Sequence, residues 1–115
     1  MLSGRSYLQD DFLPPAPVKL ISVAVGDCEV LLAWTECGAG GHGFRIERAD
    51  GIGSTCRFSE IGGVGPHVAA FRDGTAKPRT IYSYRVHAWN ASDDSLPSNV
   101  TAVAMPRAGT ELPSD

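Results

Sequence analysis

The chain has 115 residues, which suits one domain with a single buried core. Its hydrophobic content of 43% is ordinary for a globular protein. The formal net charge of -3 offers no basic field for phosphates, so we expect no nucleic-acid partner. No apolar run approaches the ~20 residues of a membrane-spanning helix, and we therefore expect no membrane span.

The amino terminus and the cysteines indicate where the chain is made. Residues 1–12 lack the apolar core of a secretory signal. Cys28, Cys37 and Cys56 make an odd number of thiols, which is typical of a reducing compartment. If Met1 is the natural start, both features predict synthesis in the cytoplasm without a signal peptide.

The first half of the chain alternates between turn-rich and apolar segments. Residues 1–13 form a polar arm, and Pro14-Pro15-Ala16-Pro17 is a stiff lead-in to a first strand. A turn at Gly26 and a glycine-rich loop over 38–43 separate the segments that follow. Strands are predicted over 18–25, 28–34 and 44–48.

The second half continues in the same way, and its best-defined strand runs from Tyr82 to Trp89. Every second residue from Tyr82 to Ala88 is aromatic or apolar, which is the period of a strand with one buried face. Further strands are predicted over 55–61, 67–71 and 98–104. Seven short strands without a helical pattern predict an all-β sandwich. Residues 107–115 are predicted to form a polar tail with no structure of its own.

Several segments follow one another in the order and spacing of a known family. They are the proline lead-in, Leu32-Ala33-Trp34, Phe44-Arg45-Ile46-Glu47-Arg48, Phe71-Arg72-Asp73, the strand from Tyr82 to Asn90, and Ser95-Leu96-Pro97-Ser98-Asn99. From about Pro14 to Pro106 the chain resembles a fibronectin type III domain of the immunoglobulin-like superfamily. Residues 1–13 are then an extended arm, 14–106 the domain and 107–115 a tail.

The resemblance implies a seven-stranded antiparallel immunoglobulin-like β-sandwich with a tyrosine corner at Tyr82. Ala76 stands where the family usually has a leucine beneath that corner, so we expect looser packing there. The alternating strands and the resemblance together imply a buried core made of Leu20, Trp34, Phe44, Ile46, Tyr82, Tyr84 and Val86.

The sequence does not assemble a catalytic, cofactor or metal site. No serine lies in a nucleophile elbow, and no glycine loop ends in the Gly-Lys-Ser/Thr that cradles phosphate. Cys37, His42, Cys56 and His67 lack the close ligand pairs of structural zinc sites. We therefore expect no enzymatic activity, no cofactor and no bound metal.

Two of the cysteines could meet across the predicted sandwich. Cys28 is predicted to lie on the same inward face as Trp34, and Cys56 is predicted to lie on the same face of its strand as Phe58, two residues away. In the family's layout both begin strands at the same end, which allows a disulfide bridge. The alternative, which we favour, is a pair of buried thiols that act as small hydrophobic side chains.

The outward positions of two neighbouring strands form the first candidate contact surface. They carry Arg45, Glu47, Arg85, His87 and Trp89. Tryptophan and arginine are enriched at binding hot spots. The alternative is that Trp89 lies over arginine stems and binds nothing. A role in sugar binding by stacking on Trp89 has the least support, because one aromatic ring is a poor platform.

The arm is the second candidate, through docking of its apolar side chains Leu2, Tyr7, Leu8 and Phe12 on another subunit. We expect a structural or adhesive module that contacts protein partners or copies of itself in a larger assembly. A short chain with its own Met1 and no signal resembles a bacteriophage virion accessory protein, which would act in the virion. The alternative is a spacer or binding module of a larger secreted bacterial protein, such as a carbohydrate-active enzyme, which would act outside the cell.

Overall fold

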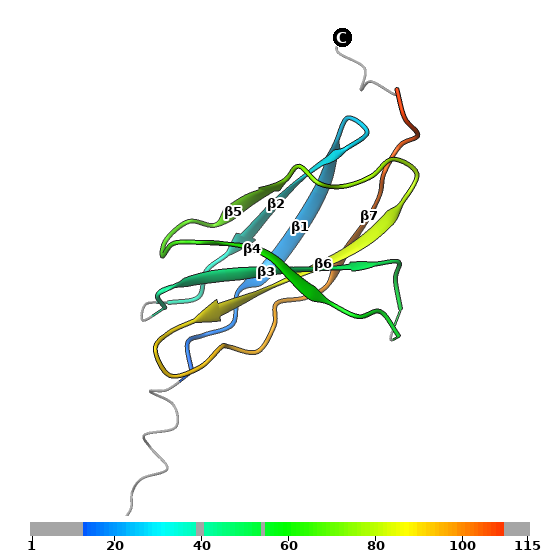
Figure 1. Ribbon diagram of the computed structural model, residues 1–115. Helices are drawn as coiled ribbons and strands as arrows, with labels where there is room; N and C mark the ends of the chain where they lie inside the picture. Colours follow the sequence, from blue (N-terminus) through cyan, green and yellow to red (C-terminus); the bar gives the residue numbers. More distant parts are fainter. Residues whose placement is uncertain (1–12, 39–40, 54, 110–115) are drawn as a thin grey trace, which may run out of the picture.

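The computed structural model describes residues 13–38, 41–53 and 55–109. These residues form seven strands in two antiparallel sheets (Figure 1). The three-stranded sheet contains, in spatial order, β1 (Val18–Val25), β2 (Glu29–Thr35) and β5 (Ala70–Asp73). The four-stranded sheet contains β4 (Ser59–Val64), β3 (Gly43–Asp50), β6 (Ile81–Trp89) and β7 (Thr101–Ala104).

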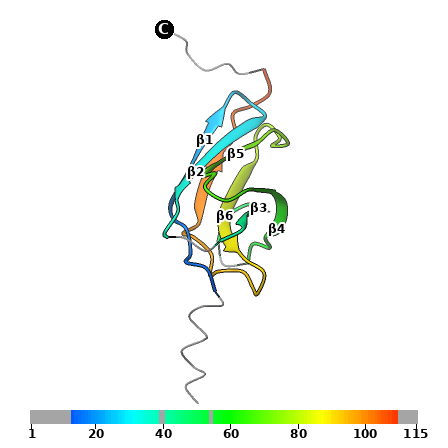
Figure 2. The same ribbon diagram turned by 90° about the vertical axis from the view of Figure 1, so that its left-hand side faces the viewer.

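The two sheets pack face to face as two layers, which Figure 2 shows from the side. The predicted all-β sandwich of seven antiparallel strands is therefore confirmed. No helix long and apolar enough to cross a bilayer occurs in the described part of the chain.

The core lies between the layers and is built from alternate residues of each strand. Trp34 of β2 meets Phe44 of β3 edge to face, with ring centroids 5.4 Å apart, so aromatic packing joins the two sheets. All seven residues expected in the core are at most 6% exposed: Leu20, Trp34, Phe44, Ile46, Tyr82, Tyr84 and Val86.

The corner before β6 has the geometry that the resemblance implies. The hydroxyl of Tyr82 accepts a hydrogen bond from the backbone N–H of Lys77 at 2.9 Å, which fixes the turn that leads into the strand. Ala76 lies beneath this corner within the core cluster and is 4% exposed.

A buried carboxylate connects the end of β5 with the opposite sheet. Asp73 is 2% exposed and accepts hydrogen bonds from Tyr84 Oη at 2.7 Å and Arg48 Nη1 at 3.0 Å through Oδ2. Its Oδ1 accepts two more from the N–H and the hydroxyl of Thr75, at 3.0 and 2.6 Å. Burial acts to raise the pKa of Asp73, but these hydrogen bonds outweigh it and hold the pKa below its ordinary value of 3.8.

The fourth strand lies later than predicted. The sequence predicts it over 55–61, whereas β4 spans Ser59–Val64 and continues through two glycines. Gly62 lies under the ring of Phe71, where a Cβ would come within 2.6 Å of the ring. The glycine that looks like the end of a strand is therefore required inside it for close packing.

The last strand is shorter than predicted, because serine side chains replace part of its ladder. The sequence predicts a strand over 98–104, whereas β7 is Thr101–Ala104. Ahead of it, the hydroxyls of Ser95 and Ser98 accept hydrogen bonds from the N–H groups of Ala88 and Val86 at 2.9 and 3.0 Å. A side-chain acceptor satisfies β6 here without a regular strand.

The favoured prediction of two free thiols is confirmed, but the predicted burial of both is wrong. Cys28 is an exposed residue of the turn before β2, which begins one residue later, so it does not share the inward face of Trp34. Cys56 is partly exposed, and its thiol lies 3.5 Å from the carbonyl oxygen of Asp50. Both thiols are free, so they form neither a bridge nor a buried pair.

The start of the predicted tail is held against the domain. The N–H of Gly109 donates to Asp27 Oδ2 at 2.7 Å, in the turn between β1 and β2. This hydrogen bond lowers the pKa of Asp27 below its ordinary value of 3.8. Residues 110–115 of the tail lie outside the described residues.

Candidate functional site

The structure brings the five expected contact residues together on the outer side of β3 and β6. In the antiparallel register Arg45 lies opposite His87, Glu47 opposite Arg85, and Gly43 opposite Trp89. We call this surface the polar face. Its side chains are half-buried rather than projecting freely, because they lie across one another.

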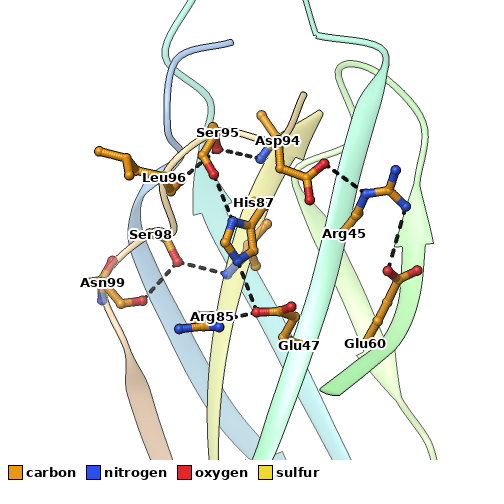
Figure 3. A network of polar contacts seen from close by, with 12 residues as sticks. Arg45, Glu47, Glu60, Arg85, His87, Asp94, Ser95, Leu96, Ser98 and Asn99 are labelled. Atoms are coloured by element: carbon orange, nitrogen blue, oxygen red, sulfur yellow. Dashed lines mark hydrogen bonds and ion pairs between the residues drawn. The ribbon is translucent and has the colours of Figure 1, made fainter. Parts of the chain in front are cut away.

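Glu47 is at the centre of the polar face (Figure 3). Its Oε1 accepts a hydrogen bond from Arg85 Nε and lies 3.0 Å from His87 Nε2. The other ring nitrogen of His87 lies 2.9 Å from the carbonyl oxygen of Ser95. Partial burial acts to raise the pKa of Glu47, but the hydrogen bonds from Arg85 and His87 outweigh it, and the pKa lies below its ordinary value of 4.5.

Arg45 joins the polar face to its surroundings. Its guanidinium lies 3.1 Å from Asp94 and 3.6 Å from Glu60, and it sits 4.9 Å from the centroid of the Trp89 ring. His42 meets the same ring edge to face at 5.5 Å. Trp89 therefore lies against the Arg45 guanidinium in a cation–π contact.

The polar face is therefore paired within the fold. Arg45, Glu47, Arg85 and His87 each have an ionic or hydrogen-bonding partner, and their side chains are between 14% and 38% exposed. A partner that bound here would have to replace contacts that the domain already makes. The arm candidates Leu2, Tyr7, Leu8 and Phe12 lie outside the described residues.

The opposite outer surface, on β1, β2 and β5, is apolar, and the sequence reasoning missed it. Outward positions meet in rows across the three strands: Ile21 with Ala33 and Ala70, and Val23 with Leu31 and Arg72. Two further rows pair Val18 with Thr35 and Val25 with Glu29. We call this surface the apolar face.

Large side chains on the apolar face remain exposed to solvent. Ile21 is 57% exposed, Val23 52% and Leu31 38%. Single exposed apolar residues are normal, but a contiguous group on neighbouring strands marks a contact surface. A salt bridge of 2.7 Å between Arg72 and Glu29 borders the group.

The signal for the apolar face was present in the sequence. β1 and β2 carry large apolar residues at both parities, as in Leu20-Ile21 and Leu31-Leu32. A strand with one solvated face alternates between apolar and polar residues, whereas these two strands do not. Only Leu20 and Leu32 of these four are buried in the core.

The enclosed space at the proline end of the sandwich is too small for a substrate. A cavity of about 80 Å³ lies there, lined by residues that include Pro14, Cys37, Phe44 and His67. Ligand pockets are commonly about 300–1,000 Å³. No group of three or more His, Cys, Asp or Glu side chains that could hold a metal ion occurs among the described residues.

No family model matches the chain, and no curated protein does. Solved structures do match. A fibronectin type III domain derived from human KIAA0970 protein superposes with a TM-score of 0.76 at 16% identity, covering 99% of this chain and 90% of that one. The chain has the fibronectin type III fold.

Structures that contain several domains also match. Domains A168–A170 from titin match with a TM-score of 0.70 at 21% identity, covering 83% of this chain. Domains FN1–FN3 of chicken CNTN1 match with a TM-score of 0.69 at 15% identity, covering 82% of this chain. The chain spans about a third of each, 33% and 32%.

Proposed function

We propose that the chain is a non-enzymatic interaction module whose apolar face binds protein. The observation that carries the proposal is the exposure of Ile21, Val23 and Leu31 side by side on one sheet. Removing such a surface from water contributes about 25 cal/mol per Å² of apolar area, against which the entropy lost on association must be set. The polar face has its charges paired internally, which makes it the less suitable surface.

The fold supports this role without specifying a partner. The same fold occurs within structures of several domains, from titin and from chicken CNTN1. The finer proposal is an accessory role in a phage virion, as a decoration, tail or adaptor protein. It rests on analogy with adhesive sandwich modules of the same fold.

A second candidate is a spacer or binding module in a larger secreted bacterial protein. One observation favours it: the first and the last described residues lie at opposite ends of the sandwich, as a linear array requires (Figure 1). The gene's neighbourhood separates the candidates. Capsid and tail genes beside it support the virion role, and an open reading frame that continues into a hydrolase supports the spacer.

Photo-crosslinking tests the contact role itself. Benzoylphenylalanine replaces Leu31 on the apolar face or, as a matched control, Leu96, which is 75% exposed in a loop elsewhere. We expect position 31 to give a discrete adduct with one protein, identified by mass spectrometry, in the cells that make the chain. Equal adducts from both positions, or none from either, would overturn the proposal.

A further inference from the structure

The apolar face is open, and its size restricts what can cover it. From Val18 to Val25 the face is about 23 Å long, since a strand rises about 3.3 Å per residue. Three strands spaced about 4.8 Å apart make it about 14 Å wide. Its footprint is therefore about 320 Å², well under the ~800 Å² per partner of a stable interface.

Face-to-face pairing of two such sheets would bury only this footprint on each copy and is too small to hold a dimer by itself. When a segment of each copy covers the face of another, each copy buries both a face and a segment, which about doubles the area. A narrow, extended segment fits the dimensions better, because it needs about seven residues to run the length of the face.

The chain contains a segment of this kind outside the described residues. Residues 1–12 reach about 40 Å when extended, enough for the face with about five residues to spare. In an extended chain Leu2, Leu8 and Phe12 fall on one side, because side chains alternate.

The lead-in limits how this segment can return to its own sandwich. Pro14 and Pro17 are buried against the domain, which anchors the lead-in at that end. Leu13 precedes a proline, which disfavours the helical region for it, and the prolines themselves have a fixed φ. An extended lead-in with restricted φ therefore disfavours a tight fold-back onto the chain's own apolar face.

We propose that residues 1–12 of one copy dock on the apolar face of a second copy. This inference rests on the proposed function and names the partner as the same chain. Each copy has one arm and one face, so the arm of one copy binds the face of the next in a head-to-tail contact. Repetition of the contact would link copies into a larger assembly, and closure would give a ring or a reciprocal dimer.

The test compares the whole chain with two matched variants. Val23→Glu places a charge on the apolar face, and Leu96→Glu places the same charge on an exposed loop leucine. We expect the mass of the wild-type chain and of Leu96→Glu to rise with concentration in sedimentation, while Val23→Glu stays monomeric. Thermal melting checks that both variants remain folded.

A synthetic peptide of residues 1–12 tests the docking directly. The buried core is drawn from Leu20 to Met105, so a chain that starts at Leu13 keeps it. The labelled peptide should bind this shortened chain, and Val23→Glu should weaken the binding at least about tenfold because it buries an unpaired charge.

Each other outcome overturns the inference in a distinguishable way. If the peptide binds the shortened chain while the whole chain stays monomeric, the arm covers its own face, and the contact between copies is refuted. If the peptide does not bind, the arm is not the occupant. A position-31 adduct with a different protein would then leave the proposed function standing, whereas the absence of any adduct would remove both.

Discussion

Replacing Asp73 with alanine tests the connection between the two sheets. The carboxylate accepts four hydrogen bonds, from Tyr84, Arg48 and two groups of Thr75, while its side chain is 2% exposed. Removal leaves the Tyr84 hydroxyl buried without this acceptor. Arg48 loses its counter-ion and keeps the Thr75 hydroxyl at 2.9 Å.

The magnitude follows from what remains unpaired. Breaking a buried ion pair by removing one partner costs about 3–5 kcal/mol, because the other charge stays in the fold. Arg48 is only 20% exposed, so we expect Asp73→Ala to lower the free energy of unfolding by about 3 kcal/mol or more. A domain of this size has about 5–15 kcal/mol in total, so the variant should stay folded without denaturant but unfold at a clearly lower urea concentration.

Urea denaturation followed by tryptophan fluorescence measures the loss. The matched control is Asp94→Ala, which removes an exposed carboxylate from Arg45 and should cost at most about 1 kcal/mol. Tyr84→Phe should cost about 1–2 kcal/mol, and the double variant less than the sum, since both changes remove the same hydrogen bond. If Asp73→Ala costs no more than Asp94→Ala, the buried carboxylate does not connect the sheets.

Three further predictions concern the corner, the carboxylates and the polar face. Tyr82→Phe removes the acceptor of the Lys77 N–H and should cost about 1–2 kcal/mol in urea denaturation; an unchanged midpoint would refute the corner's role. The folded pKa values of Asp73 and Glu47 lie below the ordinary 3.8 and 4.5, so their stabilising contribution is present at neutral pH and lost as the pH falls through the folded values. The urea concentration at the unfolding midpoint should therefore fall when the pH is lowered below about 4, and Glu47→Gln should make that fall smaller. A midpoint that does not change with pH would contradict the assignment. Trp89→Ala should cost about 1 kcal/mol, the scale of a half-exposed cation–π contact, and a loss of several kcal/mol would place its ring in the core.

The fold was predictable because its strands obey a period of two and its corner has a specific residue. Tyr82, Tyr84 and Val86 alternate with polar residues, and the structure buries them in the order expected. Strand ends were less predictable, since they depend on contacts distant in sequence. Gly62 continues a strand only because Phe71 packs on it, and the turn before β2 exposes Cys28.

The candidate surfaces were predictable only in part. Sequence parity places Arg85, His87 and Trp89 outward, but the pairing of charges depends on the register with β3, which brings Glu47 opposite Arg85. The apolar face was missed because one buried face per strand was assumed, whereas β1 and β2 are apolar on both sides. A strand that is apolar at both parities without a second covering layer is itself a sequence signal for a contact surface.

The yield of photo-crosslinked adduct from position 31, relative to position 96, tests the central claim most directly. Both native residues are exposed leucines, but only Leu31 lies on the apolar face. The proposed contact predicts a discrete adduct from position 31, several-fold above the yield from position 96, and its loss when Val23→Glu is added. Equal yields from the two positions, or an adduct that Val23→Glu leaves unchanged, would contradict a contact through this face.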